Sequence, residues 1–265
     1  MCDIEENNDL KNKVVLVTGG GSGIGAGICV EFAREGASLI VTDINRKNAE
    51  QTLEQITNIS PESSAMELDV TSSTMVDKVA EEVVAKYGKI DVWVNCAGVS
   101  YITPFLKCTE DIWNKTIDIN LKGTFNCCKS ATRQMLLNKC GSIINMSSQS
   151  GKTGNSHFAA YCASKFGVIG LTQSLAMEFA RDNIRVNTLC PGVVFTPMWD
   201  DMINDYAAKR NMKPEDVKPY FESKIPMGRI SEMEDVTKAA VFLASDNSSY
   251  ITGQSLNICG GTVMH

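Results

Sequence analysis

The chain of 265 residues contains only two histidines, His157 and His265. So small a supply argues against a histidine-based metal centre and against a Ser-His-Asp triad. The ten cysteines form no C-x-x-C pair, and Cys127 and Cys128 are adjacent, which suits a tetrahedral metal site poorly. We therefore expect no metal site.

The chain also lacks an excess of basic residues and any apolar run long enough to cross a membrane. Its formal net charge of -6 argues against a nucleic-acid partner and leaves no basic stripe for a membrane surface. Three of the first six residues are acidic and none is basic, the opposite of a secretory signal. The cysteines are accordingly expected to be reduced structural thiols in a cytoplasm.

What is present suits one large α/β domain covering residues 1–265. Hydrophobic residues make up 43% of the chain and charged residues 21%, which is enough apolar material for a sizeable core. No stretch in the middle has the composition of a linker. Residues 1–12 are polar and are expected to form a flexible leader before the domain.

Short β-branched runs alternate with longer amphipathic segments along the chain. Strands are expected over residues 14–17, 38–42, 65–69, 90–94, 142–146, 185–189 and 255–258. Helices are expected from the glycine-rich turn to about residue 35 and over 48–59, 75–87, 111–137, 161–180 and 235–243. Continuously apolar strands alternating with helices predict a Rossmann-like, doubly wound, seven-stranded parallel sheet flanked by helices on both faces. Such sheets bind ligands beyond the carboxyl ends of their strands.

The run from Thr18 to Gly25, with the sequence TGGGSGIG, separates the first expected strand from the first expected helix. Glycine allows a tight turn and a close approach to a pyrophosphate, whose negative charge is favoured by a helix N-terminus. A flexible loop without a ligand is the alternative. Because a strand precedes the run and a helix follows it, a dinucleotide-binding turn is the better interpretation.

Asp43 closes the second expected strand, eighteen residues beyond Gly25. A carboxylate there can accept the ribose hydroxyls of adenosine and repels a 2′-phosphate, which predicts NAD rather than NADP. Ser22 occupies a position in the turn where an arginine could have bound that phosphate. The nearby Arg46 and Lys47 keep NADP open, and a merely solvated aspartate is the alternative to any cofactor role.

Tyr161 and Lys165 are four residues apart, so on a helix they share one face. A tyrosine pKa of about 10 suits acid–base chemistry poorly at neutral pH, and a neighbouring ammonium is expected to lower the phenol's pKa. Alone, such a pair is more often a solvated helix face. Ser148, thirteen residues upstream, raises the pair to a candidate catalytic group, with Ser147 as the competing hydroxyl.

Taken together, these motifs resemble the short-chain dehydrogenase/reductase family in its single-domain form, over nearly the whole chain. Cys96 departs from the family pattern, which often has a second asparagine there, and this puts one local hydrogen bond in doubt. The matching elements are Thr18 to Gly25, Asp69, Asn95-Cys96-Ala97-Gly98, Asn120, Ser148, Tyr161-x-x-x-Lys165, and Pro191-Gly192 leading to Thr196.

The resemblance implies roles for individual residues in an NAD-dependent enzyme acting on CH–OH groups. Tyr161 would exchange a proton with the substrate oxygen, Ser148 would hold that oxygen, and Lys165 would lower the tyrosine pKa and bind the nicotinamide ribose. Asn120 would position a water that relays protons to Lys165. The implied cofactor contacts are Gly19, Gly21, Ser22, Gly23, Ile24, Gly25, Asp43, Ile44, Asp69, Val70, Asn95, Ala97, Gly98, Tyr161, Lys165, Pro191, Gly192, Val194 and Thr196.

Residues 197–225 are expected to form a lid over the substrate, since they follow the nicotinamide contact. Gln149 and His157 are expected at the rim, where polar groups suit a small polyol, a vicinal diol or a hydroxyketone. The lid's Trp199 and Met202 complete the predicted substrate contacts and would serve a hydroxysteroid equally well. Alternatively, the lid's apolar residues pack against the body of the protein or against a neighbouring subunit. By resemblance, polyol and acetoin/butanediol dehydrogenases are favoured, with hydroxysteroid dehydrogenases and 3-oxoacyl reductases as alternatives.

Two rival classes remain open at this point. A non-catalytic NAD-binding regulator would need the glycine turn but not Ser148, Tyr161 and Lys165 in register. An epimerase or dehydratase of the extended relatives normally has a larger carboxyl-terminal substrate domain than the roughly 70 residues after Thr196. The resemblance also implies a homotetramer, assembled through the helices expected over 111–137 and 161–180 and through the last strand and tail.

Overall fold

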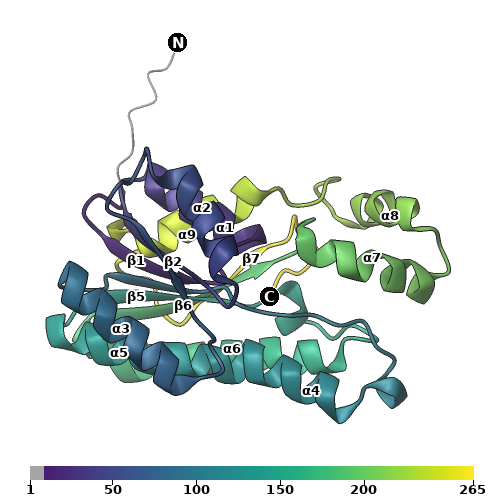
Figure 1. Cartoon of the computed structure of the whole chain (residues 1–265). Helices are drawn as coiled ribbons and strands as arrows, with labels where there is room; N and C mark the ends of the chain where they lie inside the picture. Colours follow the sequence, from purple (N-terminus) through teal and green to yellow (C-terminus); the bar gives the residue numbers. More distant parts are fainter. Residues whose placement is uncertain (1–8) are drawn as a thin grey trace.

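The computed structural model describes residues 9–265 and has a single seven-stranded sheet in its centre (Figure 1). The strands are β1 (Val14–Thr18), β2 (Ser38–Asp43), β3 (Ser64–Glu67), β4 (Val92–Asn95), β5 (Gly141–Met146), β6 (Ile184–Pro191) and β7 (Ser255–Ile258). All neighbours pair in parallel, in the order β3-β2-β1-β4-β5-β6-β7. The order reverses between β1 and β4, which places a ligand site outside that point. The predicted fold class is confirmed.

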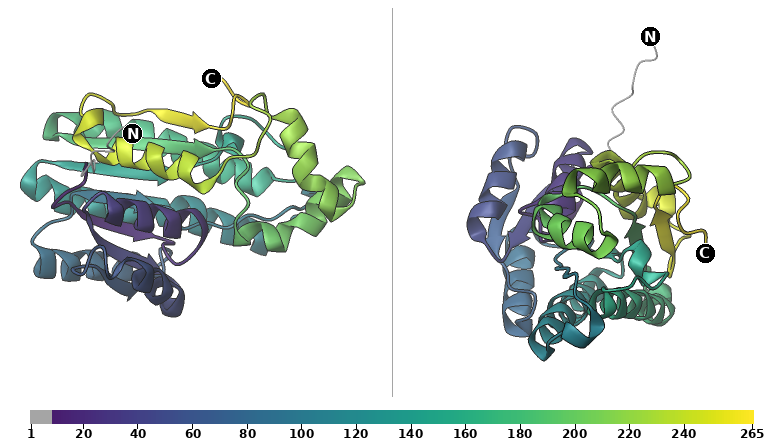
Figure 2. Two further views of the ribbon diagram at one scale, coloured as in Figure 1. Left: turned by 90° about the horizontal axis from the view of Figure 1, so that it is seen from above. Right: turned by 90° about the vertical axis from the view of Figure 1, so that its right-hand side faces the viewer.

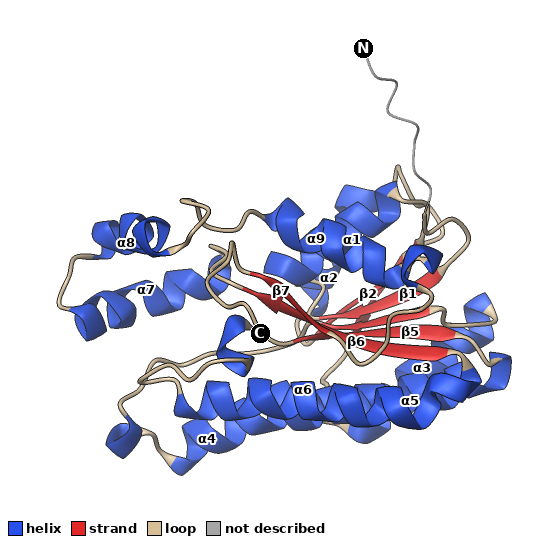
Figure 3. Ribbon diagram, turned by 180° about the vertical axis from the view of Figure 1, so that it is seen from behind, coloured by secondary structure: helices blue, strands red, loops and turns tan. Residues whose placement is uncertain are grey.

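Helices cover both faces of the sheet, as Figure 3 shows from behind. One layer contains α1 (Gly23–Arg34), α2 (Arg46–Ile56) and α9 (Met233–Ala244). The other contains α3 (Ser73–Tyr87), α4 (Glu110–Ile117), α5 (Thr124–Asn138) and α6 (Ala159–Phe179). Alternate side chains of one strand feed the two cores, because successive residues of a strand point to opposite faces. In β1, Val15 and Val17 pack with the first layer, whereas Leu16 packs with the second.

The first residues of the described chain are held more firmly than a leader would be. Residues 1–8 of the expected leader lie outside the described residues. Leu10, however, is completely buried, and its backbone N–H donates to the Glu35 carbonyl oxygen over 3.1 Å. The prediction of a flexible leader up to residue 12 was therefore wrong at its inner end, because a single leucine in a polar stretch fills a gap beside α1.

The long helix expected over 111–137 is interrupted by a π-helical segment, Asp118–Gly123, between α4 and α5. π-Helical turns are rare and are frequently found at functional sites. Here the segment contains Asn120, whose side chain is bonded outside the helix. Periodicity along the sequence could not show this interruption, since its cause is a tertiary contact.

The lid predicted over 197–225 consists of α7 (Pro197–Arg210), a 3₁₀ turn (Pro214–Asp216) and α8 (Val217–Lys224). Figure 2 shows these two helices standing beyond one end of the sheet. Rings from this segment pack against one another: Trp199 and Phe221 meet edge to face with their ring centroids 5.5 Å apart, and the tilted rings of Tyr206 and Phe221 have centroids 4.8 Å apart. Between residues 9 and 265, we find no helix with the length and apolarity needed to span a membrane.

Candidate active site

A cavity of about 390 Å³ lies at the carboxyl ends of the strands and is covered by the lid. Its wall is formed by the glycine-rich turn, the ends of several strands, the start of α6 and the lid helices. Most residues predicted from the sequence for the site line this cavity. They are Gly19, Ser22, Gly23, Ile24, Gly25, Asp43, Ile44, Asp69, Val70, Ala97, Gly98, Ser148, Gln149, Tyr161, Lys165, Pro191, Gly192, Val194, Thr196, Trp199 and Met202.

The glycine-rich turn requires glycine for reasons of space and conformation. Gly19 has a φ of +64°, and a Cβ on it would lie 2.8 Å from the Cα of Ala97 in the loop after β4. Ser22, the N-cap of α1, makes no side-chain capping bond, and the first turn carries no acidic residue. The first N–H groups of α1 therefore remain available to an anion, which fits a pyrophosphate. Gly21 itself lies behind the cavity wall, where its N–H donates to Asp43.

Asp43 joins the end of β2 to the glycine-rich turn. Its two carboxylate oxygens accept backbone N–H groups, one from Gly21 at 3.2 Å and one from Asn45 at 2.9 Å. These bonds hold the carboxylate in the cavity wall, in a position suited to ribose hydroxyls. Arg46, the nearest candidate for a 2′-phosphate, donates instead to Glu50 at 2.8 Å.

Asn95 lies beneath the cavity rather than in its wall. It is 3% exposed, accepts from the Trp93 indole N–H at 2.9 Å and donates to Asn145 at 2.8 Å. Asn95 therefore ties β4 to β5 under the loop that carries Ala97 and Gly98. The departure noted at Cys96 leaves this network intact, because the Cys96 backbone N–H donates to the Thr18 hydroxyl at 3.2 Å.

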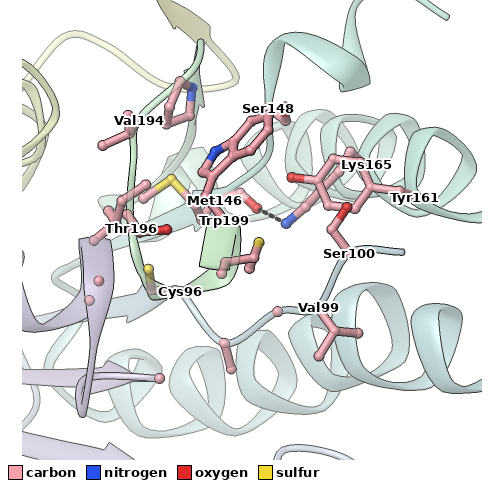
Figure 4. A pocket seen from close by; sticks show the side chains of 18 of the residues that line it. Cys96, Val99, Ser100, Met146, Ser148, Tyr161, Lys165, Val194, Thr196 and Trp199 are labelled. Carbon is pink, nitrogen blue, oxygen red and sulfur yellow. Dashed lines mark hydrogen bonds between the residues drawn. The ribbon is translucent and has the colours of Figure 1, made fainter. Parts of the chain in front are cut away.

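Tyr161 and Lys165 lie on consecutive turns near the start of α6, with the Lys165 Nζ 5.6 Å from the centre of the tyrosine ring. Lys165 is only 4% exposed and donates to the Met146 carbonyl oxygen at 2.8 Å, as Figure 4 shows. Burial lowers the pKa of Lys165 to about 8. The lysine thus keeps most of its charge at neutral pH.

The pKa of Tyr161 does not move as the sequence alone suggested. Burial raises it to about 12, and the largest opposing influence is a hydrogen bond with the Ser148 side chain. Desolvation of the phenolate is thus the dominant influence on this pKa. At neutral pH the phenol is accordingly protonated and able to donate.

The two adjacent serines have different surroundings. Both line the cavity, but it is Ser148 whose side chain hydrogen-bonds Tyr161. The Ser147 hydroxyl donates to the Lys165 backbone carbonyl at 2.9 Å, which uses it to attach α6 to the end of β5. Geometry therefore favours Ser148 as the hydroxyl that meets a substrate.

Asn120 is buried behind the cavity wall. Its Oδ1 accepts from the Val99 N–H at 2.8 Å, and its Nδ2 donates to the Val99 carbonyl at 2.9 Å and to the Ser164 hydroxyl at 3.1 Å. A Cβ on Gly98 would lie 3.3 Å from Asn120 Oδ1 and 3.6 Å from Lys165 Nζ. Asn120 thus joins the loop after β4 to the helix that carries Lys165.

After β6, the chain passes under the lid and reaches Thr196, the N-cap of α7. A Cβ on Gly192 would lie 2.9 Å from the Cα of Cys259, so this strand end packs closely against the tail. The Thr196 side chain faces Gly23 of the glycine-rich turn, since a Cβ on Gly23 would lie 3.4 Å from the Thr196 Cβ. This contact brings the start of the lid against the turn.

His157 lies outside the cavity wall, unlike the other predicted substrate residues. Its φ of +66° turns the chain just before α6, and its carbonyl accepts from the Thr103 N–H at 2.8 Å. Its neighbours Asn155 and Phe158 line the cavity instead.

Several cavity residues were missed by sequence reasoning, because they lie in loops without a motif or belong to the lid's aromatic set. They include Val99, Ser100, Asn155, Phe158, Tyr206 and Phe221. Cys96, which also lines the cavity, lies within a motif but was given no contact. Only the lid aromatics gave a signal, through their clustering in the segment over 197–225. Burial raises the pKa of the Cys96 thiol to about 12, so this cavity thiol is neutral.

Comparison with known proteins finds relatives that are reductases or dehydrogenases. A family model described as enoyl-(acyl carrier protein) reductase matches residues 19–263. A 3-oxoacyl-[acyl-carrier-protein] reductase of Thermotoga maritima is 40% identical, covering 96% of this chain and 99% of its own. A galactitol 2-dehydrogenase of Agrobacterium fabrum is 38% identical, with 96% and 99% covered.

Solved structures agree with these sequence relatives. The crystal structure of sorbitol-6-phosphate 2-dehydrogenase from Erwinia amylovora has a TM-score of 0.91 and 34% identity, covering 95% of this chain and all of that one. The family model spans nearly the whole chain, and Ser148, Tyr161 and Lys165 meet in one cavity. The chain belongs to the short-chain dehydrogenase/reductase family, whose members use NAD or NADP, and is a dehydrogenase/reductase acting on CH–OH groups.

Proposed function

We propose that the protein is an NAD-dependent oxidoreductase that interconverts a secondary alcohol and its ketone, with a small polyol, vicinal diol or hydroxyketone as substrate. The observation that carries this substrate class is the polar content of the cavity beside Ser148 and Tyr161. Ser100, Gln149 and Asn155 all line it. The identity to galactitol 2-dehydrogenase over nearly the full chain supports the same class.

The residues of this chain supply positioning and proton transfer, whereas bound NAD supplies the hydride acceptor or donor. Ser148 donates to the substrate oxygen and polarises the reacting carbon. Tyr161, protonated at neutral pH, gives its proton to a ketone oxygen, and its phenolate receives the proton of an alcohol. Lys165 stabilises that phenolate by its charge. Asn120 holds the loop at Val99 and the helix at Ser164, next to Lys165, through its side-chain hydrogen bonds.

Asp43 carries the preference for NAD in this proposal. Its carboxylate is fixed in the cavity wall by two backbone N–H groups, and Arg46 is paired with Glu50. The 2′-phosphate of NADP would lie beside the negative charge of Asp43, and Arg46 is already paired with Glu50. Asp43→Ala is expected to reduce the ratio of NAD to NADP efficiency by about tenfold, which is roughly the effect of one lost charged hydrogen bond. An unchanged ratio would place the selectivity elsewhere.

A 3-oxoacyl reductase is the second candidate, supported by the 40% identity to the Thermotoga maritima enzyme. A hydroxysteroid is the third, because Trp199, Tyr206 and Phe221 give the lid side of the cavity an aromatic surface.

The deciding experiment measures NADH formation or consumption by purified protein. Its substrate panel contains hexitols and their phosphates, 2,3-butanediol and acetoin, 3-oxoacyl thioesters, and hydroxysteroids, with NADP(H) run in parallel. We expect the best kcat/KM with a polyol or diol. Efficient turnover of only an acyl thioester or only a steroid would reject the proposed substrate class.

We also propose a homotetramer. The α4–α6 side of the molecule exposes large apolar side chains: Phe125 and Phe166 are each 47% exposed, and Trp113 is 39% exposed. On the last strand and tail, Leu256 is 40% exposed and Met264 84%. Exposed apolar groups on these two surfaces are suited to contacts between copies. Light scattering at micromolar concentration should give four times the chain mass, and a monomer would refute the assembly.

A further inference from the structure

The Ser100 hydroxyl is a polar group of the cavity with no role in the reaction described so far. Within the described part of the chain, a few buried side-chain atoms have no hydrogen-bond partner: the hydroxyls of Ser100, Ser130, Thr132 and Ser255, and Oδ1 of Asn257. Of these residues, Ser100 is the one that lines the cavity. A buried hydroxyl without a partner destabilises a protein, so its presence in a binding cavity calls for an explanation.

The backbone around Ser100 is fixed on both sides. Val99 is held at its N–H and its carbonyl by the Asn120 side chain, over 2.8 Å and 2.9 Å. Three residues further on, the Thr103 N–H donates to the His157 carbonyl over 2.8 Å. The backbone on both sides of Ser100 is therefore fixed, which holds the residue in the cavity wall.

Ser100 also lies close to the reacting centre. A Cβ on Gly98 would lie 3.6 Å from Lys165 Nζ, and two further residues of chain span at most about 7 Å. Figure 4 shows the Ser100 side chain directed from its loop toward the side of the cavity where Tyr161 and Lys165 lie. The Ser100 hydroxyl thus lies on the side of the cavity where the reacting carbon would be held by Ser148 and Tyr161.

We infer that Ser100 is a specificity-determining residue that hydrogen-bonds a second substrate oxygen on the carbon next to the reacting one. Its hydroxyl can donate to a carbonyl oxygen or accept from a hydroxyl, so it serves both the vicinal diol and the hydroxyketone. This inference rests on the proposed substrate class. A mono-alcohol, which lacks the second oxygen, leaves the Ser100 hydroxyl unpaired.

The test compares Ser100→Ala with wild type on matched substrate pairs: 2,3-butanediol against 2-butanol, and acetoin against 2-butanone. We expect Ser100→Ala to lower kcat/KM for the diol and acetoin by at least about tenfold, mainly through KM, with less than about a twofold change for 2-butanol and 2-butanone. Ser100→Thr keeps the hydroxyl and should restore most of the diol preference. Ser100→Cys retains a side chain but not a strong hydrogen bond, and should behave like Ser100→Ala.

Ser130→Ala is the matched control. It removes the same atom from another buried hydroxyl without a partner, in α5 and outside the cavity. Both members of each substrate pair should be unaffected by it. Thermal unfolding of every variant, followed by circular dichroism, checks that the fold is retained.

Different failures have different signatures. If Ser100→Ala and Ser100→Cys reduce both members of a pair equally, or change neither, the specificity role of Ser100 is rejected while the proposed function stands. If wild type turns over neither 2,3-butanediol nor acetoin but accepts acyl thioesters or steroids, the proposed substrate class fails and this inference fails with it.

Discussion

The two walls of the cavity are held in place by different forces. The wall made by the glycine-rich turn and the loop after β4 depends on backbone atoms in close contact and on hydrogen bonds to Asp43 and Asn120. The lid wall depends on packed aromatic rings and on Lys209 of α7, whose ammonium donates to Asn155 Oδ1 at 2.8 Å and to the Ser156 carbonyl at 2.6 Å. The first wall therefore tolerates little change, whereas the lid can vary in sequence and change what it accepts.

The largest effect is expected from Tyr161→Phe, which removes the proposed proton donor at the start of α6 and leaves the two walls unchanged. Turnover should fall by about 10²–10⁴-fold, the usual contribution of general acid–base catalysis. NAD affinity, followed by the quenching of protein fluorescence, should be nearly unchanged. Near-normal turnover would contradict the acid–base role of Tyr161.

The pH dependence of the two reaction directions should differ. The pKa of Tyr161 is raised to about 12, so the phenolate fraction increases about tenfold per pH unit below that value. Alcohol oxidation, which needs the phenolate, should accelerate from pH 6 to 8, whereas ketone reduction stays level. Above pH 8, Lys165 loses its charge and no longer favours the phenolate, so oxidation should flatten and reduction should decline. An oxidation rate independent of pH between 6 and 8 would contradict this assignment.

A smaller but clear effect is expected from Gly19→Ala. The new Cβ would meet the Ala97 backbone at 2.8 Å, and the φ of +64° disfavours any residue with a side chain. We expect a loss of about 1–3 kcal/mol in the free energy of unfolding, together with weaker NAD binding. Urea denaturation and a binding titration measure the two quantities.

Gly170→Ala in α6 is the control for that substitution, because a Cβ there meets nothing within 4 Å. It should leave NAD binding intact and the stability unchanged or slightly higher, as alanine favours helix. Equal losses of stability and NAD binding in both variants would show that the close contact at Gly19 is not their cause.

The smallest effect is expected at the lid, from Lys209→Met. This variant keeps the aliphatic stem but loses both hydrogen bonds to the loop before α6. KM for the alcohol should increase roughly threefold to tenfold, with NAD affinity unchanged. Lys213→Met, in the same segment but paired only with Glu215 at the surface, is the control and should behave like wild type. An equal change in NAD affinity would show that the two walls are not independent.

Much of the first wall, and the pair of Tyr161 and Lys165 on α6, could be predicted from the sequence, because each feature is local. Glycine spacing after an apolar run, a carboxylate at a strand end and Tyr161 four residues before Lys165 are all visible along the chain. The interruption of the long helix at Asn120, the burial of Leu10 and the network around Asn95 were not. Each depends on partners far away in sequence, such as Val99 and Asn145, which no periodicity reveals.

The substrate side was predicted less completely for a physical reason. Gln149, Trp199 and Met202 line the cavity. His157 does not: its backbone carbonyl accepts from Thr103, and its neighbours Asn155 and Phe158 line the cavity instead. Which of several neighbouring loop residues faces a cavity depends on backbone dihedral angles, such as the φ of +66° at His157, rather than on residue type.

The π-helical segment around Asn120 has a consequence for local unfolding. One amide side chain there joins the backbone at Val99 to the Ser164 hydroxyl on α6, so neither the loop nor the first turns of α6 can open without breaking its bonds. In native-state hydrogen exchange, the amide protons of Val99 and of the start of α6 should therefore exchange as one cooperative unit. The first turns of α6 and a loop more than sixty residues earlier would share a single opening free energy.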